Sequence, residues 1–273
     1  MSRTATAILS TENLLHNLQV IKNQVKPSKI IAMVKANAYG HGIRSVGLRL
    51  DGQVDMMGVA SIDEALALRK AGVKTDILLA EGVFEQNELL IAATEKLHVV
   101  FHNQTQMEWL DKSTLPLPIH AWIKIRTGMG RLGFGPNEAH QSYEYLRGHT
   151  KTHKPVRVMS HFACADDKNH PLNAQQMDIF KSFIKNIERE FSLCNSAGIF
   201  NYQDCYYDYV RPGLALYGIS PVPEKSALEL GLKPVMTLQS SLIAVQGFDK
   251  GDSIGYGARC TYDVDIPVGI IAF

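Results

Sequence analysis

The fold is decided by residues 30–42, which read Ile30-Ile31-Ala32-Met33-Val34-Lys35-Ala36-Asn37-Ala38-Tyr39-Gly40-His41-Gly42. The apolar run at the start lacks the alternation of a half-exposed strand, which predicts a strand covered on both faces, as in parallel sheets. Lys35 closes this run. Burying an ammonium is costly unless it is paired, so Lys35 is expected to give up its proton or to bind a covalent partner. A desolvated amine suits Schiff-base chemistry with a carbonyl cofactor, although a lysine at a strand end can also reach water.

Strand-like and helix-like segments alternate from residue 30 onward. Apolar runs predict strands at 30–34, 56–60, 76–80, 97–101, 120–125, 156–161, 191–195 and 210–217. Helical spacing and capping residues predict helices at 12–26, 61–70, 85–96, 104–112, 137–147 and 177–191. Such alternation implies right-handed βαβ units, and eight of them predict a closed (β/α)₈ barrel of the TIM type. An open doubly wound sheet is the alternative, but no GxGxxG motif follows the first strand.

The pattern changes after the eighth strand. Residues 234–246 predict an extended β-hairpin arm, residues 252–259 place Tyr256 between two glycines on a turn, and residues 267–273 form another apolar run. The loss of helical spacing predicts the start of an all-β domain. We therefore expect a barrel over residues 9–225 and an incomplete β domain made of residues 1–8 and 226–273.

Composition excludes several classes of protein. The chain has 273 residues, of which 45% are hydrophobic and 20% charged, and its net charge of +1 does not favour nucleic acid or an anionic membrane as a partner. Its four cysteines are widely spaced without a CxxC pair, which argues against a zinc site or a disulfide framework. The N-terminus lacks a long apolar segment, and no run approaches the roughly 18 apolar residues of a membrane span. We expect a cytoplasmic protein without a metal site.

Polar residues gather where the predicted strands end. They are Lys35 and Tyr39 after the first strand, Lys124 to Arg131 after the fifth, His161 after the sixth, Asn195 and Ser196 after the seventh, and Arg211 to Gly213 at the eighth. Each residue alone has an ordinary structural explanation. In a barrel, however, functional groups lie at the carboxyl ends of the strands, so their gathering there predicts one site.

Six segments occur in a fixed order along the chain, namely Val34 to Gly42, Thr127 to Gly133, Ser160 to Ala163, Asn195 to Ala197, Arg211 to Gly218 and Gly255 to Gly257. Together they resemble the motifs of bacterial alanine racemases. The resemblance covers essentially the whole chain. Family members have a barrel followed by a complete β domain, and they continue into a GYGDGY-type segment that is absent from this sequence.

The resemblance implies an enzyme that interconverts L- and D-alanine, which supplies D-alanine for the cell wall. Lys35 would hold pyridoxal 5'-phosphate as a Schiff base and act as one of two bases. Tyr256, supplied by the other subunit of a head-to-tail homodimer, would be the second base. Racemisation needs two bases because one removes the Cα proton and the other returns a proton from the opposite face. His161 and Arg211 would tune Tyr256, and Arg211 would also donate to the pyridine nitrogen of the cofactor.

The resemblance also assigns the remaining site residues. Tyr39, Ser196, Gly213 and Leu214 would bind the phosphate, and Arg131 would orient the substrate carboxylate or Tyr256. Lys124 matches a lysine that is carbamylated in many relatives. Relatives usually carry Asp or Asn two residues further on, whereas this chain has Arg126, which alters the local charge.

Three other interpretations compete with this one. The chain could be a racemase for serine, lysine or a broad range of amino acids, because the pocket residues that set specificity lie partly in the absent segment. It could be a non-catalytic barrel that carries pyridoxal phosphate, but such proteins lack the β domain, and Tyr256 between glycines argues against this. It could also be an inactive dimerising scaffold, which the presence of Lys35, His161 and Arg211 disfavours.

Overall fold

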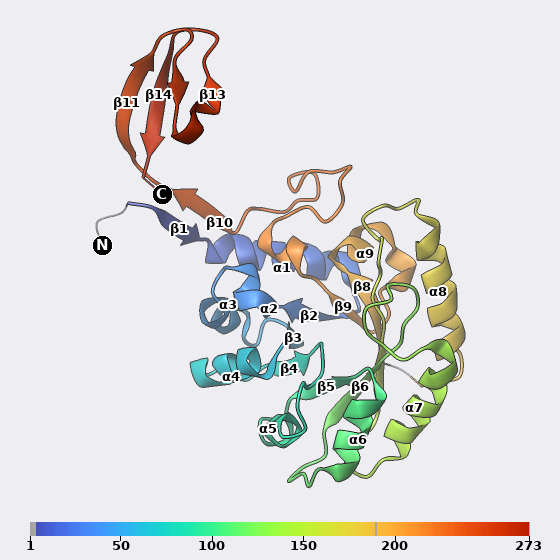
Figure 1. Ribbon diagram of the computed structural model, residues 1–273. Coiled ribbons are helices and arrows are strands. Elements are labelled where there is room, and N and C mark those ends of the chain that lie inside the picture. Colours follow the sequence, from blue (N-terminus) through green and yellow to red (C-terminus); the bar gives the residue numbers. More distant parts are fainter. Residues whose placement is uncertain (1–3, 189, 273) are drawn as a thin grey trace. The chain divides into compact units, whose positions relative to one another are not determined.

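The computed structural model describes residues 4–188 and 190–272, and the chain divides into two compact units (Figure 1). One unit is Thr11–Val235. The other consists of the residues through Ser10 together with those from Met236 onward.

In the part of the chain that the structure describes, eight parallel strands close into a barrel, which confirms the predicted fold class. The strands are β2 (Lys29–Met33), β3 (Met56–Val59), β4 (Asp76–Leu79), β5 (His98–Phe101), β6 (His120–Lys124), β7 (Arg157–Met159), β8 (Phe191–Asn195) and β9 (Tyr209–Arg211). Closure is achieved by β2, which pairs with β3 on one side and with β9 on the other. The carboxyl ends of all eight strands therefore meet at one rim of the barrel.

The helices surround the strands (Figure 1). They are α1 (Thr11–Val25), α2 (Lys35–Tyr39), α3 (Ile43–Leu50), α4 (Ile62–Ala71), α5 (Glu88–Thr94), α6 (Gln104–Lys112), α7 (Pro136–Gly148), α8 (Pro171–Ile184) and α9 (Ser196–Asn201). Among the described residues, no helix combines the length and the apolar character needed to cross a bilayer. Helix α8 begins earlier than its spacing predicts, because the side chain of His170 caps its first turn and Pro171 follows directly.

The barrel has an inner and an outer apolar layer. Alternate strand residues point inward and pack together, and they include Ile31, Met56, Leu78, Val100, Trp122 and Tyr209. Their neighbours along each strand, such as Ile30, Met57 and Val99, point outward and pack under the helices. Both faces of every strand are thus buried, which explains why the strands read as continuous apolar runs.

The segment α2 is a left-handed turn after β2 rather than a right-handed helix. The φ angles are 51° at Ala36, 55° at Asn37, 55° at Ala38 and 53° at Tyr39. This conformation costs an ordinary residue roughly 1–2 kcal/mol, so the surroundings must enforce it. The side chain of Asn37 accepts a hydrogen bond from the backbone N–H of Ile43 at 2.9 Å, its carbonyl accepts one from Gly42 at 2.9 Å, and Ala38 is fully buried. The turn therefore fixes Lys35 and Tyr39 at the rim of the barrel.

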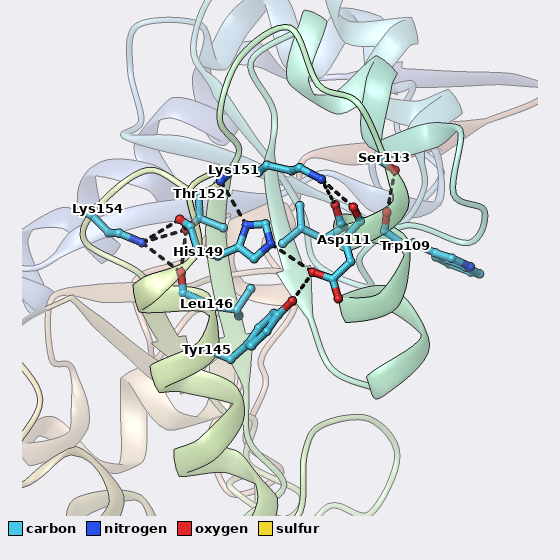
Figure 2. A network of polar contacts seen from close by, with 10 residues as sticks. Trp109, Asp111, Ser113, Tyr145, Leu146, His149, Lys151, Thr152 and Lys154 are labelled. Carbon is cyan, nitrogen blue, oxygen red and sulfur yellow. Dashed lines mark hydrogen bonds and ion pairs between the residues drawn. The ribbon is translucent and has the colours of Figure 1, made fainter.

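A polar network joins the two helices that flank β6 (Figure 2). Asp111 at the end of α6 accepts hydrogen bonds from the hydroxyl of Tyr145 in α7 and from Nε2 of His149, the latter at 3.1 Å. The ammonium of Lys151 donates to the last carbonyls of α6, and that of Lys154 donates to the end of α7. Cations are favourable at the carboxyl ends of helices, so the network stabilises both helix ends.

The second unit consists of antiparallel pairs. They are β1 (Thr6–Leu9) with β10 (Met236–Gln239), β11 (Leu242–Phe248) with β14 (Ile266–Ile271), and β12 (Ser253–Ile254) with β13 (Cys260–Thr261). The predicted hairpin over residues 234–246 is therefore wrong, because β10 and β11 pair with different strands. Tyr256 lies on a turn between Gly255 and Gly257, both with positive φ, and its side chain is fully exposed.

Candidate active site

The rim of the barrel encloses a cavity of about 470 Å³ at the ends of the strands. Nine of the ten residues expected at the site line it, namely Lys35, Tyr39, Lys124, Arg131, His161, Ser196, Arg211, Gly213 and Leu214. The tenth, Tyr256, belongs to the other unit. The cavity size lies within the range of about 300–1,000 Å³ that is usual for small-molecule sites.

Arg211 ends β9 and is held by four acceptors. Its guanidinium donates to Oγ of Ser192 at 2.5 Å, to the carbonyls of Ser160 at 2.5 Å and Leu193 at 3.2 Å, and to Nδ1 of His161 at 3.1 Å. Burial lowers the pKa of Arg211 to about 10, so the group remains charged at neutral pH. Because a guanidinium can only donate, any ring nitrogen placed against it must act as an acceptor.

His161 is neutral in this site. Its pKa lies well below the usual value, first because the ring is buried and then because Arg211 and Lys124 repel a positive charge there. Nδ1 accepts the hydrogen from Arg211, so the hydrogen of the neutral ring is on Nε2. His161 therefore presents an apolar ring face and one donor.

Hydroxyl groups and backbone N–H groups converge near Gly213. Oγ of Ser196 accepts hydrogen bonds from the N–H of Gly213 at 2.8 Å and from that of Ala215 at 3.3 Å. A side chain at Gly213 would place its Cβ 2.5 Å from the hydroxyl of Tyr39, so only glycine lets this hydroxyl approach the backbone. Burial raises the pKa of Tyr39, which keeps its hydroxyl protonated. Because Oγ of Ser196 accepts from two N–H groups, its own hydrogen can donate outward, and together with the hydroxyl of Tyr39 it suits a phosphate group.

Two lysines reach the cavity. Nζ of Lys35 lies 3.3 Å from a carboxylate oxygen of Glu81. Lys124 is buried, and its pKa is lowered to about 8 by desolvation and then by the charges of Arg211 and Arg131. The neutral fraction of Lys124 near neutral pH is therefore much larger than that of an ordinary lysine, although the ammonium still predominates.

Arg126, the departure noted in the sequence, lies outside the cavity. Its side chain is exposed, and its guanidinium lies beside Gly135. The next residue, Thr127, is buried, and its hydroxyl pairs with Oγ of Ser160 at 2.7 Å while Nε2 of Gln176 donates to it at 3.1 Å. These bonds hold the loop that carries Arg131.

Glu81 was not predicted from the sequence, although a signal for it was present. It follows β4 by two residues and precedes Gly82, so it lies at the same strand-end position as the other site residues. Gln176 had no comparable signal, because it lies within helix α8 rather than at a strand end. Only the folded chain brings its side chain to the carbonyl of His161, to which it donates a hydrogen bond.

The fold and site define a (β/α)₈-barrel protein with a cation-rich cavity at the carboxyl ends of its strands. A sequence profile described as "Alanine racemase, N-terminal domain" matches residues 9–221. The alanine racemase of Vibrio vulnificus (strain CMCP6) is 43% identical over 270 residues, which are 99% of this chain and 75% of that protein. That of Legionella pneumophila (strain Lens) is 42% identical, with 100% and 76% covered. The chain belongs to the alanine racemase family.

Solved structures agree with this assignment. The biosynthetic alanine racemase from Pseudomonas aeruginosa superposes with a TM-score of 0.95 at 36% identity, over 98% of this chain and 75% of that one. The alanine racemase from Bartonella henselae, which was solved with covalently bound pyridoxal phosphate, has a TM-score of 0.84 at 27% identity, with 98% and 75% covered. The chain is thus homologous to a pyridoxal-phosphate-dependent isomerase over about three quarters of its relatives' length.

Proposed function

We propose that this chain is a racemase that interconverts L- and D-alanine with pyridoxal phosphate bound to Lys35. The observation that carries the proposal is the convergence of Lys35, His161 and Arg211 in one cavity of a member of this family. We propose alanine as the substrate because the relatives are alanine racemases, and we infer the type of reaction from the residues in the cavity.

The residues in the cavity fit this cofactor. Lys35 supplies the amine for a covalent bond, and Arg211 supplies a donor for the pyridine nitrogen. The hydroxyls of Ser196 and Tyr39 and the backbone N–H of Leu214 would donate to the phosphate, while the N–H of Gly213 orients the hydroxyl of Ser196. When bound, pyridoxal phosphate stabilises negative charge at the Cα of an amino acid. Because Arg211 can only donate, it would leave a pyridine nitrogen placed against it unprotonated, and the ring would then withdraw electrons less strongly. We therefore expect little diversion of alanine into transamination.

Inversion at Cα needs two groups on opposite faces, and we assign these roles to Lys35 and Tyr256. One removes the proton and the other returns one, and the roles are exchanged in the reverse direction. Tyr256 is fully exposed on its turn, so its hydroxyl is free to serve a second copy of the chain. We infer a homodimer in which each site is completed by Tyr256 of the other subunit. Arg131, exposed at the rim, would bind the substrate carboxylate.

Carbamylation of Lys124 forms part of the same proposal. The reaction with carbon dioxide needs a neutral amine, and the lowered pKa of Lys124 supplies one. The resulting carboxylate would lie among Arg131, Arg211 and Lys35. Arg126 is exposed and does not stand against this modification. Intact-mass measurement in bicarbonate, with Lys124→Met as control, tests it.

The test of the proposal begins with trapping. The purified protein is incubated with pyridoxal phosphate and reduced with borohydride, and the modified residue is located by mass spectrometry. We expect modification at Lys35, loss of it in Lys35→Met, and retention in Lys29→Met, which changes an exposed lysine at the other end of the same strand. Racemisation of D- and L-alanine, compared with serine and lysine, then tests the substrate. Absence of trapping at Lys35 at saturating cofactor would contradict the proposal.

A further inference from the structure

Glu81 contacts the amine on which the proposed chemistry depends. One of its carboxylate oxygens accepts a hydrogen bond from Nζ of Lys35 at 3.3 Å. The side chain of Glu81 is 36% exposed and that of Lys35 is 31% exposed, so both lie at the mouth of the cavity rather than in bulk water. The contact therefore acts at the place where a ligand would meet Lys35.

The backbone holds Glu81 firmly in this position. The N–H of Ala80 continues the barrel ladder to the carbonyl of Val59 at 2.9 Å. Gly82 follows with a φ of 73°, and a side chain there would overlap the carbonyl of Val100 and the amide of Gln106. The placement of Glu81 thus depends on a packed turn that only glycine can form.

A histidine fixes the same turn from the other side. Nε2 of His102 lies 2.9 Å from the carbonyl of Glu81. Burial lowers the pKa of His102, so its ring is neutral and its N–H donates to this carbonyl. Glu81 is therefore presented to the cavity from a rigid strand end.

The charges around this pair are mostly positive. Among the described residues that line the cavity, the cations are Lys35, Lys124, Arg131 and Arg211, and the carboxylates are Glu81 and Asp166. His161 is neutral, and Asp166 is exposed in the loop after β7. Glu81 raises the pKa of Lys124, whereas Lys35 lowers it, so the carboxylate interacts with both amines. Without Glu81, the ammonium of Lys35 would face three other cations with no carboxylate in contact.

We infer that Glu81 is a positioning residue for Lys35, holding its amine at the mouth of the cavity through their ion pair. The inference rests on the proposed function for its consequence, because a two-base racemisation needs one base in its protonated form when the other removes a proton. By stabilising the ammonium among Lys124, Arg131 and Arg211, Glu81 keeps Lys35 ready to donate a proton to Cα.

The test measures the reactivity of Lys35 without the cofactor. Reductive methylation with formaldehyde and cyanoborohydride requires the neutral amine, and mass spectrometry gives its rate at each lysine. An ion pair of this exposure supports an effect of about twofold to fivefold. We therefore expect Lys35 in Glu81→Gln to be methylated about twofold to fivefold faster at neutral pH than in the wild-type chain.

Three comparisons make the result decisive. Asp166→Asn removes the other carboxylate and is expected to leave the rate at Lys35 unchanged, and Lys29 serves as an internal reference in every variant. Glu81→Asp keeps the charge and is expected to restore part of the protection. Equal rates at Lys35 in the wild-type chain and in Glu81→Gln across the pH range would overturn the inference.

Racemisation is measured separately with cofactor and alanine. If the wild-type chain does not racemise alanine but Glu81 slows the methylation of Lys35, the proposed function is refuted and the inference about Glu81 stands. If the chain racemises alanine but Lys35 reacts equally fast in Glu81→Gln, the proposed function stands and the inference about Glu81 is refuted. If both hold, kcat in Glu81→Gln is expected to fall about twofold to fivefold with little change in KM.

Discussion

Replacing Ala36 by glycine should stabilise the barrel, although glycine normally destabilises regular structure. Ala36 is exposed and has a φ of 51°. A left-handed conformation costs an L-residue roughly 1–2 kcal/mol, and glycine avoids this cost but loses about 0.5–1 kcal/mol through the greater freedom of its unfolded state. The net gain is therefore about 0.5–1 kcal/mol. The matched control is Ala174, an exposed alanine inside the right-handed helix α8. There the same substitution should cost about 1 kcal/mol.

Urea unfolding followed by tryptophan fluorescence measures both effects. The chain has two tryptophans, Trp109 and Trp122, and both lie in the barrel unit, so the signal reports that unit. We expect the midpoint to rise in Ala36→Gly and to fall in Ala174→Gly, with the slope unchanged in both. A fall in both variants would refute the argument, because it would mean that the turn imposes no strain on Ala36. Weaker cofactor binding by Ala36→Gly would show that the strain also serves to orient Lys35.

Three further perturbations follow from the structure. Tyr256→Phe should lower racemisation by about 10²- to 10⁴-fold without changing barrel stability, while Tyr262→Phe in the same unit stays active in the same assay. Gly218→Ala should destabilise the barrel by about 3 kcal/mol in urea, because Gly218 has a φ of 80° and a side chain there would overlap the carbonyl of Lys233. Burial and the neighbouring histidines lower the pKa of His120 from 6.5 to about 4, so the unfolded chain binds more protons in this range. Stability should therefore fall between pH 6.5 and 4 by about 1 kcal/mol, discounted for solvent exposure, and His120→Gln should remove this part.

Elements with local signals were predicted well. Helix α6 spans residues 104–112 as predicted, because Asn103 caps it by accepting from the N–H of Gln106 and its apolar residues keep helical spacing. The alternation of strands and helices was enough to predict the barrel. Phe191 continued the helical spacing of α8 but belongs to β8, because the chain leaves the helix after Ile184 and enters the sheet.

Features that depend on distant contacts could not be predicted. The partner of β10 is β1, which lies more than 200 residues earlier in the chain, and no local pattern specifies this pairing. The left-handed turn contains alanine and asparagine rather than glycine over residues 36–38, and helix propensity gives no indication of its handedness. Both the strand pairing and the handedness of the turn are imposed by packing and hydrogen bonds that exist only in the folded chain.

The candidate site followed from one rule about barrels. Polar residues at strand ends were expected to meet, and Lys35, His161 and Arg211 do line one cavity. The rule could not give the environment of each group. The neutral state of His161 and the lowered pKa of Lys124 result from burial and from neighbouring charges that only the folded chain brings together.

The excess of cations at the cavity mouth has a consequence for the speed of ligand capture. Among the described lining residues, Lys35, Lys124 and two arginines face Glu81 and Asp166, so the mouth carries net positive charge although the whole chain is nearly neutral. Such a local field attracts anions by diffusion and raises their association rate, and dissolved salt screens it over about 10 Å. Phosphate-bearing and carboxylate ligands should therefore bind more slowly as ionic strength rises, and inorganic anions should compete for the same entrance.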